Sequence, residues 1–449
     1  MIDTYSAALA FIHGRTQFKK APTLSRMRQF LHELGDPQLK VAGIHVAGTN
    51  GKGSTVANLR ELFMADGLTV GTFTSPFIVR FNERISVDGT PISDEELVGL
   101  VQQIQPIVAK LDATLASGGP TEFEIITAMM FLYFAAQPID IAIIEVGLGG
   151  LYDSTNVWTP AVSVITTIGY DHMQILGNTL TAIATQKAGI IKTQVPVIVG
   201  KLPAEAQQVM IDTAMSKRAP LRTLGVDFTT KLLPPQGWQE RFNFDGLEAH
   251  FKDLTTPLLG DYQVDNAAVA IAAYLTYHQA TQLPVVTSDV KAAVAATQWP
   301  GRFERLNQDP LIMIDGAHNE PAVTELAATL SERFGQQTVY VIFAVLADKQ
   351  HQQMIQTLGA LPNVQLRLTQ FEGPNAKRPA TDPTMLAHEM PNGRTAEVFD
   401  NWQAALMQTL QEMSSDDALL LTGSLYFISD VRAYFKDGKI GRASCRERV

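Results

Sequence analysis

Short apolar runs rich in β-branched residues alternate with helix-compatible stretches over the first 200 residues of the chain. The apolar runs cover residues 41–47, 68–73, 139–147, 161–166 and 195–199, and the stretches between them cover 55–65, 94–116, 122–136 and 179–191. Such runs are typical of strands buried on both faces, and Ser93 with Glu96 forms a capping box at the start of the second helix. The alternation predicts an α/β fold with a mainly parallel sheet wrapped by helices.

The pattern changes after residue 220. Residues 221–257 contain Pro234-Pro235, Asp245-Gly246 and short alternating runs, which predict a small antiparallel patch. A helix is predicted over 261–280. Residues 298–301 are expected to be a linker, because proline and glycine interrupt them. The βα alternation then resumes, with strands at 311–315, 338–345 and 417–421 and helices at 320–334 and 350–359.

These elements predict two domains, one over residues 1–297 and a smaller, Rossmann-like α/β domain over 302–437. The length of 449 residues agrees, since it exceeds what one hydrophobic core usually supports. The net charge of −10 argues against a broad nucleic-acid-binding face. No apolar run is long enough to span a membrane, and no signal-peptide pattern is found. We expect a cytoplasmic protein that binds neither nucleic acid nor membrane.

The only cysteine, Cys445, fits a reducing compartment. It lies in the segment 438–449, which holds four basic residues and one acidic residue and shows no amphipathic period. We interpret this segment as a non-native tail and leave it out of the fold argument. A flexible basic tail is the alternative.

A glycine-rich segment follows the first predicted strand and reads Gly48-Thr49-Asn50-Gly51-Lys52-Gly53-Ser54. Glycines at a strand-to-helix turn allow backbone N–H groups to converge on an anion, and the helix N-terminus adds positive potential. Lys52 adds a full charge. The segment departs from the standard P-loop, because Val46 replaces the first glycine and Gly53 follows the lysine. It nevertheless predicts a nucleotide phosphate site, with an ordinary glycine turn as the alternative.

Polar residues follow several other predicted strands, at the sheet edge where α/β proteins bind their ligands. Ser75 follows the run 68–73, Glu145 ends the apolar run after Ile139, and Asp171 with His172 follows the run 161–166. A carboxylate leaving an apolar strand is costly unless a positive group meets it, and Mg²⁺ with nucleotide phosphates would do so. For Glu145, a capping or salt-bridge role is the alternative.

Three further features could carry chemistry. Lys187 lies on a predicted helix at the margin of an apolar face, where a lysine normally extends its ammonium group to water. If it is buried instead, its pKa is lowered and the amine becomes reactive. Arg302 in the linker could reach a phosphate. Asp315-Gly316-Ala317-His318-Asn319 ends a strand of the second domain and forms another polar cluster there.

Taken together, these segments resemble the Mur ligase superfamily and, within it, the folylpolyglutamate synthases. The resemblance rests on the glycine-rich segment and on matches in the family's order over residues 45–430. The matching segments are Thr74–Ile85, Thr121–Glu124, Glu145–Gly150 with Asp153–Asn156, Asp171-His172, Lys187–Ile190, Gly260–Gln263 with Asn266, Trp299–Arg302, Asp315–Asn319 and Thr422–Ser424. Leu151-Tyr152 departs from the family pattern, and a substrate contact is expected to differ there.

The resemblance implies an ATP-dependent amide ligase that converts the terminal carboxylate of a folate to an acyl phosphate and couples it to L-glutamate. On that pattern Lys52 and the loop amides hold the β- and γ-phosphates. Ser75 and Glu145 bind one Mg²⁺, and His172 binds a second. The pattern also implies that CO₂ carbamylates Lys187, which makes it an anionic metal ligand.

The resemblance assigns the remaining residues to the substrates. Asn266, Arg302, Asp315 and His318 are expected to bind ATP. The folate is expected to contact Phe77 and Arg84, Asp153 is expected to contact a substrate, and Ser424 is a weaker candidate for binding glutamate. The partners are then small molecules, and we expect a monomer.

Three alternatives stay open from the sequence. The chain could join glutamate to dihydropteroate, as a dihydrofolate synthase does, alone or as a second activity. It could be a P-loop switch, although no Asn-Lys-x-Asp guanine motif occurs. It could also be a Mur ligase for cell-wall precursors, against which only the resemblance of the loop Phe77–Ile85 argues.

Overall fold

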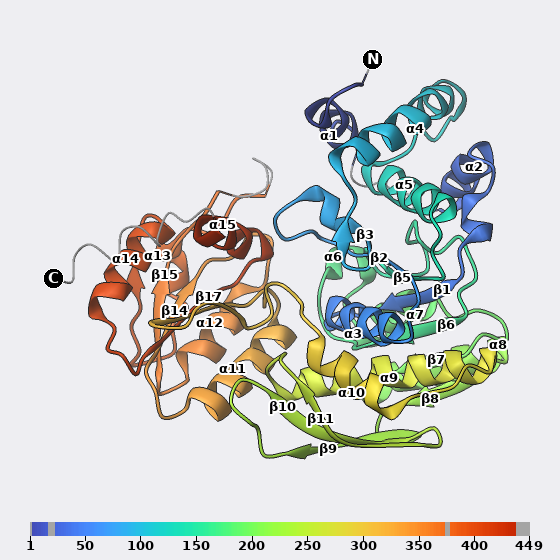
Figure 1. Ribbon diagram of the computed structural model, residues 1–449. Coiled ribbons are helices and arrows are strands. Elements are labelled where there is room, and N and C mark those ends of the chain that lie inside the picture. The colour runs from blue at the N-terminus through green and yellow to red at the C-terminus, as the bar shows by residue number, and fades with distance from the viewer. Residues whose placement is uncertain (1, 17–22, 373–377, 437–449) are drawn as a thin grey trace. The chain divides into compact units, whose positions relative to one another are not determined.

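The computed structural model describes residues 2–16, 23–372 and 378–436 (Figure 1). The tail at 438–449, with Cys445, lies outside the described residues. The chain divides into two compact units. Unit 1 comprises residues 1–257 and 263–298, and unit 2 comprises residues 258–262 and 299–449.

Unit 1 is built on an eight-stranded sheet with the order β4-β3-β2-β5-β1-β6-β7-β8. All neighbouring pairs are parallel except β2–β3 and β3–β4, which confirms the predicted mainly parallel sheet. The strands are β1 Gly43–Ala47, β2 Val70–Phe73, β3 Ile85–Val87, β4 Thr90–Pro91, β5 Ile141–Glu145, β6 Val162–Ile165, β7 Val197–Val199 and β8 Leu221–Thr223.

Helices cover both faces of this sheet, because alternate strand residues point to opposite sides. Ile141 and Ile143 belong to one apolar core, while Ala142 and Ile144 belong to the other. The first core lies under α3 Lys52–Ala65, α9 Asp261–Thr281 and α10 Thr287–Ala296. The second lies under α1 Tyr5–His13, α2 Ser25–Glu33, α4 Asp94–Thr114 and α5 Glu122–Ala136. A third cluster packs α7 Leu180–Ala188 and α8 Ala204–Lys217 beside β6 and β7.

A separate antiparallel sheet lies where the sequence predicts one. It consists of β9 Phe228–Leu233, β10 Glu240–Gly246 and β11 Ala249–Thr256, in the order β11-β10-β9. Its aromatic side chains, among them Phe242 and Phe244, pack into the same core as α9. The prediction was wrong for residues 221–223, which form β8 and extend the main sheet by pairing parallel to β7.

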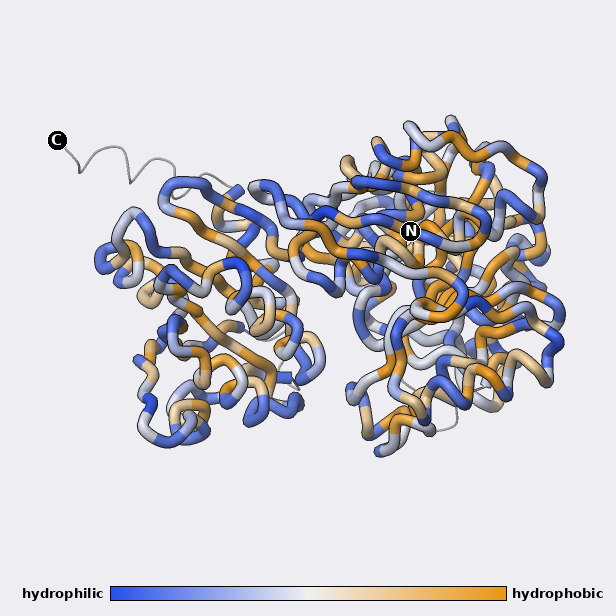
Figure 2. The backbone as a smooth tube through the Cα atoms, turned by 90° about the horizontal axis from the view of Figure 1, so that it is seen from below, coloured by the Kyte–Doolittle hydropathy of each residue, from blue (hydrophilic) through white to orange (hydrophobic). Residues whose placement is uncertain are grey.

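Unit 2 contains a six-stranded sheet in the order β12-β13-β17-β14-β15-β16, parallel except at the β12 edge. Its strands are β12 Glu304–Asn307, β13 Leu311–Ile314, β14 Val339–Phe343, β15 Val364–Leu368, β16 Glu397–Val398 and β17 Ala418–Thr422. Its helices are α11 Glu320–Phe334, α12 His351–Gly359, α13 Pro383–Ala387, α14 Trp402–Glu412 and α15 Leu425–Lys436. Figure 2 shows hydrophobic segments inside each unit and hydrophilic segments toward its surface.

The sequence pattern located most long elements but missed several short ones. The capping box of Ser93 and Glu96 is present at the start of α4. Helix α3 begins at Lys52, three residues before the predicted start, so the lysine of the glycine-rich segment is its first residue. Helices α1 and α2 were not predicted, because nine residues are too few to show a clear period.

Candidate active site

The glycine-rich turn connects the end of β1 to the start of α3. Gly51 has φ +83°, a conformation that favours glycine. A Cβ atom on Gly51 would lie 2.2 Å from Oδ1 of Asn266, and one on Gly48 would lie 1.8 Å from Oγ1 of Thr166. A side chain at either position would have to displace the polar side chain that faces it, and Gly51 also has a backbone conformation that other residues rarely adopt. The predicted site residue Asn266 on α9 therefore lies against the turn.

Hydrogen bonds from the segment after β6 fix the turn, and the sequence analysis did not foresee them. The amide of Thr49 donates to the carbonyl of Thr167 at 2.8 Å, and that of Asn50 donates to Thr167 Oγ1 at 3.0 Å. Thr166 Oγ1 donates to the Asn50 carbonyl at 2.6 Å. With these two amides engaged, the N–H groups at the start of α3 are the ones that can face an anion.

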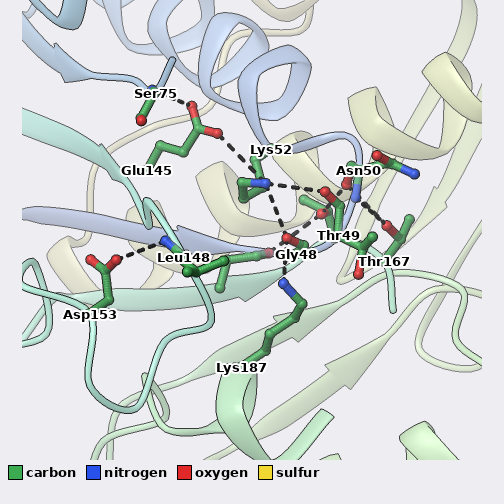
Figure 3. Close-up of polar contacts among 12 residues, drawn as sticks. Gly48, Thr49, Asn50, Lys52, Ser75, Glu145, Leu148, Asp153, Thr167 and Lys187 are labelled. Atoms are coloured by element: carbon green, nitrogen blue, oxygen red, sulfur yellow. Dashed lines mark hydrogen bonds and ion pairs between the residues drawn. The ribbon is translucent and has the colours of Figure 1, made fainter. Parts of the chain in front are cut away.

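Lys52 and Glu145 meet at this turn (Figure 3). Lys52 Nζ donates to the carbonyls of Gly48 and Thr49 at 3.1 and 3.2 Å, and it lies 3.8 Å from Glu145 Oε1. Glu145 is the last residue of β5 and is 4% exposed. The buried carboxylate thus faces a cation, as the sequence argument required. Gly53 and the buried Ser54 follow in the first turn of α3.

Ser75 lies beside Glu145, and Arg84 of the segment Thr74–Ile85 contacts it. The Ser75 amide donates to Glu145 Oε2 at 3.3 Å, and Arg84 Nη1 donates to Ser75 Oγ at 3.0 Å. The guanidinium of Arg84 stacks over the rings of Phe77 and Phe81, with centroid distances of 5.1 and 5.6 Å. Cation–π contacts of this kind hold an arginine in one orientation. The structure therefore brings the predicted residues Ser75, Phe77, Arg84 and Glu145 together.

Lys187 joins the same turn from α7. It is 5% exposed, and its Nζ donates to the Gly48 carbonyl at 2.8 Å, so that two lysines share one carbonyl (Figure 3). Burial, reinforced by the charge of Lys52, lowers the pKa of Lys187 to about 7. A substantial fraction of this amine is therefore neutral and nucleophilic at neutral pH.

His172 follows β6 with φ +51° and precedes the short helix α6 Met173–Leu176. Its Nε2 lies 3.8 Å from Asp171 Oδ1, and its side chain is 43% exposed. Among the residues that the structure describes, no group of three or more His, Cys, Asp or Glu side chains is arranged to hold a metal ion. The Glu145 carboxylate and the hydroxyl of the neighbouring Ser75 are oxygen donors of the kind that Mg²⁺ prefers, and Mg²⁺ usually takes only one or two carboxylates and fills its other positions with phosphate oxygens and water.

Asp153, a predicted substrate residue, holds the loop that follows β5. Its carboxylate accepts hydrogen bonds from the Leu148 amide at 2.9 Å and from the amide and hydroxyl of Thr155 at 3.0 and 2.5 Å. Burial raises the pKa of Asp153, and these hydrogen bonds oppose the rise. All of these contacts are made within the loop itself.

In unit 2, Arg302, Asp315, His318 and Ser424 lie near the ends of β13 and β17. Buried Asp315 accepts hydrogen bonds from the amides of Phe303 and Ala317 at 3.0 and 2.8 Å. Burial raises the pKa of Asp315, and the positive charge of Arg302 opposes this rise. His318 Nδ1 lies 2.8 Å from the Gly316 carbonyl. The amide of Gly423, just before the buried Ser424, donates to the Ala317 carbonyl at 3.1 Å.

Comparison with known families accounts for both units. Residues 46–274 match the Mur ligase middle domain, and residues 301–425 match the Mur ligase glutamate ligase domain. The chain belongs to the Mur ligase family. It is 42% identical over 440 residues to the dihydrofolate synthase/folylpolyglutamate synthase of Bacillus subtilis, covering 97% of this chain and all of the relative.

Solved structures agree with this membership. A folylpolyglutamate synthase in complex with AMPPCP and folate has a TM-score of 0.84 at 38% identity, and the match covers 96% of this chain and 99% of that chain. The Mycobacterium tuberculosis folylpolyglutamate synthase in complex with ADP has a TM-score of 0.87 at 29% identity, over 96% and 98% of the two chains. These matches confirm the predicted fold class and family. Within the described residues, no helix is long and apolar enough to cross a bilayer.

Proposed function

We propose that this Mur ligase family member is an ATP-dependent amide ligase that adds L-glutamate to the terminal carboxylate of a reduced folate, with ADP and phosphate as the other products. The observation that carries the proposal is the cluster beside the glycine-rich turn: Lys52 and Lys187 both donate to the Gly48 carbonyl, and the carboxylate of Glu145 faces Lys52. Relatives of nearly the same length are named for this activity, and one solved complex holds both AMPPCP and folate.

Nucleotide binding follows from the glycine-rich turn. The N–H groups at the start of α3 and the ammonium of Lys52 bind the β- and γ-phosphates, while Asn266 supports the turn from α9. To reach a phosphate, Lys52 exchanges its hydrogen bonds to the carbonyls of Gly48 and Thr49 for phosphate oxygens. We assign Arg302, Asp315 and His318 of unit 2 to the nucleotide as well.

Ser75 and Glu145 supply oxygen ligands for one Mg²⁺, and we assign His172 and Lys187 to a second. A bound Mg²⁺ neutralises phosphate charge during phosphoryl transfer. We further propose that Lys187 carries a carbamate. Its neutral amine attacks the carbon of CO₂, a C–N bond forms as one C=O π bond opens to an oxyanion, and the nitrogen loses a proton. The amine that shares the Gly48 carbonyl with Lys52 thereby becomes part of an anion.

The reaction then proceeds in two steps. A carboxylate oxygen of the folate attacks the γ-phosphorus and ADP leaves, which gives an acyl phosphate. The amino nitrogen of glutamate attacks the acyl carbon, loses a proton, and phosphate leaves as the amide forms. We assign Phe77, Arg84 and Asp153 to the folate and Ser424 to glutamate. The guanidinium of Arg84, held over two aromatic rings, is placed to attract a carboxylate.

One observation favours a second activity. The Bacillus subtilis relative is named for both dihydrofolate synthase and folylpolyglutamate synthase, and the two reactions share the acyl-phosphate chemistry. Since one chain contains both a middle domain and a glutamate ligase domain, we propose that it works as a cytoplasmic monomer with small-molecule partners.

The test is phosphate release from Mg·ATP and L-glutamate with 5,10-methylene-tetrahydrofolate, with dihydropteroate or without a pterin, with the products identified by mass. Release that requires the reduced folate and yields a product one glutamyl residue heavier supports the proposal. Activity with dihydropteroate as well establishes the second function. Release that is independent of either pterin refutes the ligase assignment and favours a nucleotide-dependent switch.

A further inference from the structure

His45 is a fully buried histidine in the middle of β1, and the mechanism above gives it no role. Its neighbours Ile44 and Val46 pack into the core under α3, so His45 points to the opposite face of the sheet. There its ring lies 6.0 Å from that of Trp158, centroid to centroid. Burying an imidazole is unfavourable unless hydrogen bonds compensate for the loss of water. An apolar residue would fill this position at lower cost.

A chain of hydrogen bonds leads from His45 to the loop after β5. His45 Nε2 lies 2.8 Å from Thr155 Oγ1, and Thr155 Oγ1 lies 2.5 Å from Asp153 Oδ1. The carboxylate of Asp153 also accepts two backbone N–H bonds, from Leu148 and Thr155. The single hydroxyl proton of Thr155 is therefore donated to the carboxylate, and its oxygen accepts from His45. That direction requires the neutral tautomer with its proton on Nε2.

The protonation state of the His45 ring agrees with a hydrogen bond donated from His45 to Thr155. Burial, with a contribution from the charge of Lys192, lowers the pKa of His45 to about 3, so the ring is neutral throughout the working pH range. His45 Nδ1 has no hydrogen-bond partner among the described residues. Leaving a buried polar atom unpaired is unfavourable, so packing alone does not account for a histidine at this position.

The loop at the other end of the chain packs against the helix of Lys187. The Leu151 amide donates to the Gln186 carbonyl at 2.7 Å. A Cβ atom on Gly150 would lie 2.8 Å from the Gln186 carbonyl oxygen and 3.0 Å from that of Lys187. Figure 3 shows Leu148 and Asp153 to the left of Gly48, and Lys187 reaching Gly48 from below. The position of this loop therefore limits where α7 can place the Lys187 amine.

We propose that His45 is a positioning residue for the ligase: its Nε2–H orients the Thr155 hydroxyl toward Asp153, and Asp153 holds the loop 147–153 against the helix that carries Lys187. The assignment of an effect on turnover rests on the proposed function. The position of the proton and the rigidity of the loop do not depend on it.

Two variants of His45 separate hydrogen bonding from packing. A glutamine amide nitrogen can occupy the position of Nε2, whereas an asparagine amide reaches only as far as Nδ1. His45→Gln is therefore expected to keep kcat within about threefold of the wild type, and His45→Asn to lower it at least tenfold, with KM for ATP changed less than kcat. Thr155→Val should act like His45→Asn, and the double variant should be no worse, because both remove the same link.

Two readouts need no turnover. Nitrogen-15 NMR of the full-length protein should show His45 protonated on Nε2 only, and hydrogen exchange of the Leu148 and Thr155 amides should be faster in His45→Asn but not in His45→Gln. A proton on Nδ1, or equal exchange in both variants, overturns the proposal. Equal kcat in two variants of equal thermal stability overturns it as well. If the wild type lacks ligase activity, the proposed function fails while NMR and exchange still decide the positioning role.

Discussion

Replacing Lys187 by methionine should stabilise the protein while abolishing its activity. Lys187 is 5% exposed, and burial with the nearby charge of Lys52 lowers its pKa from 10.5 to about 7. In the unfolded chain the lysine keeps its proton up to about pH 10.5, so between pH 7 and 10.5 the unfolded state binds more protons. Stability therefore rises with pH across this window, and the full cost of the buried ammonium applies below pH 7.

The size of the pKa shift determines how much the buried Lys187 lowers the free energy of unfolding. At about 1.4 kcal/mol per pKa unit, the cost of Lys187 is about 4 kcal/mol at pH 7 and about 2 kcal/mol at pH 9. Urea unfolding in CO₂-free buffer should therefore show Lys187→Met more stable than the wild type by a few kcal/mol at pH 7, with a gap that shrinks by about 2 kcal/mol at pH 9. Methionine fills a similar volume without a charge.

Two controls sharpen this experiment. Lys252→Met, at an exposed lysine of the same unit, should change stability by less than about 0.5 kcal/mol at either pH. Added bicarbonate should stabilise the wild type but not Lys187→Met if the amine forms a carbamate. Equal stabilities at pH 7, or a gap independent of pH, would refute the argument that Lys187 is buried as a destabilised cation. Full turnover in Lys187→Met would remove the residue from the mechanism.

Three further predictions concern the turn and the core. Lys52→Ala should abolish phosphate release and lower the melting temperature, because Glu145 then stays buried without its cation; an active variant would contradict the nucleotide site. Gly51→Ala should weaken ATP binding at least tenfold by calorimetry, because the new Cβ would lie 2.2 Å from the side-chain oxygen of Asn266 on α9. The control is Gly35→Ala, whose glycine has a similar φ of +81° but no atom within 4 Å of the new Cβ. This control tests backbone strain alone, and the variant should bind ATP normally. Arg26→Met should cost about 3–5 kcal/mol in urea unfolding, because Glu124 then stays buried without its cation and keeps its hydrogen bond from the Thr121 amide. Adding Glu124→Gln should restore much of this stability, and no recovery would show that the 2.8 Å ion pair is not the cause.

The pattern of hydrophobic and polar residues was sufficient to predict the strands and helices that depend on residues close together in the sequence. The apolar runs predicted β1, β5 and β6, and the glycine-rich segment was placed correctly between a strand and a helix. Residues 221–223 were assigned to the wrong sheet, because three residues show no periodicity that tells a parallel edge strand from an antiparallel one. The roles of the individual site residues stay predictions.

Local sequence determined the glycine turn, the lysine that opens α3 and the carboxylate that ends β5, since each depends on residues a few positions apart. Tertiary structure alone decided what those groups meet. Lys187 reaches the carbonyl of Gly48 across 139 positions, and His45 reaches Thr155 across 110. Such contacts depend on β1 lying between β5 and β6, an order set by packing of the whole sheet. No periodicity in the chain encodes the order of the strands, so the sequence indicated which groups could react and the fold decided which of them lie together.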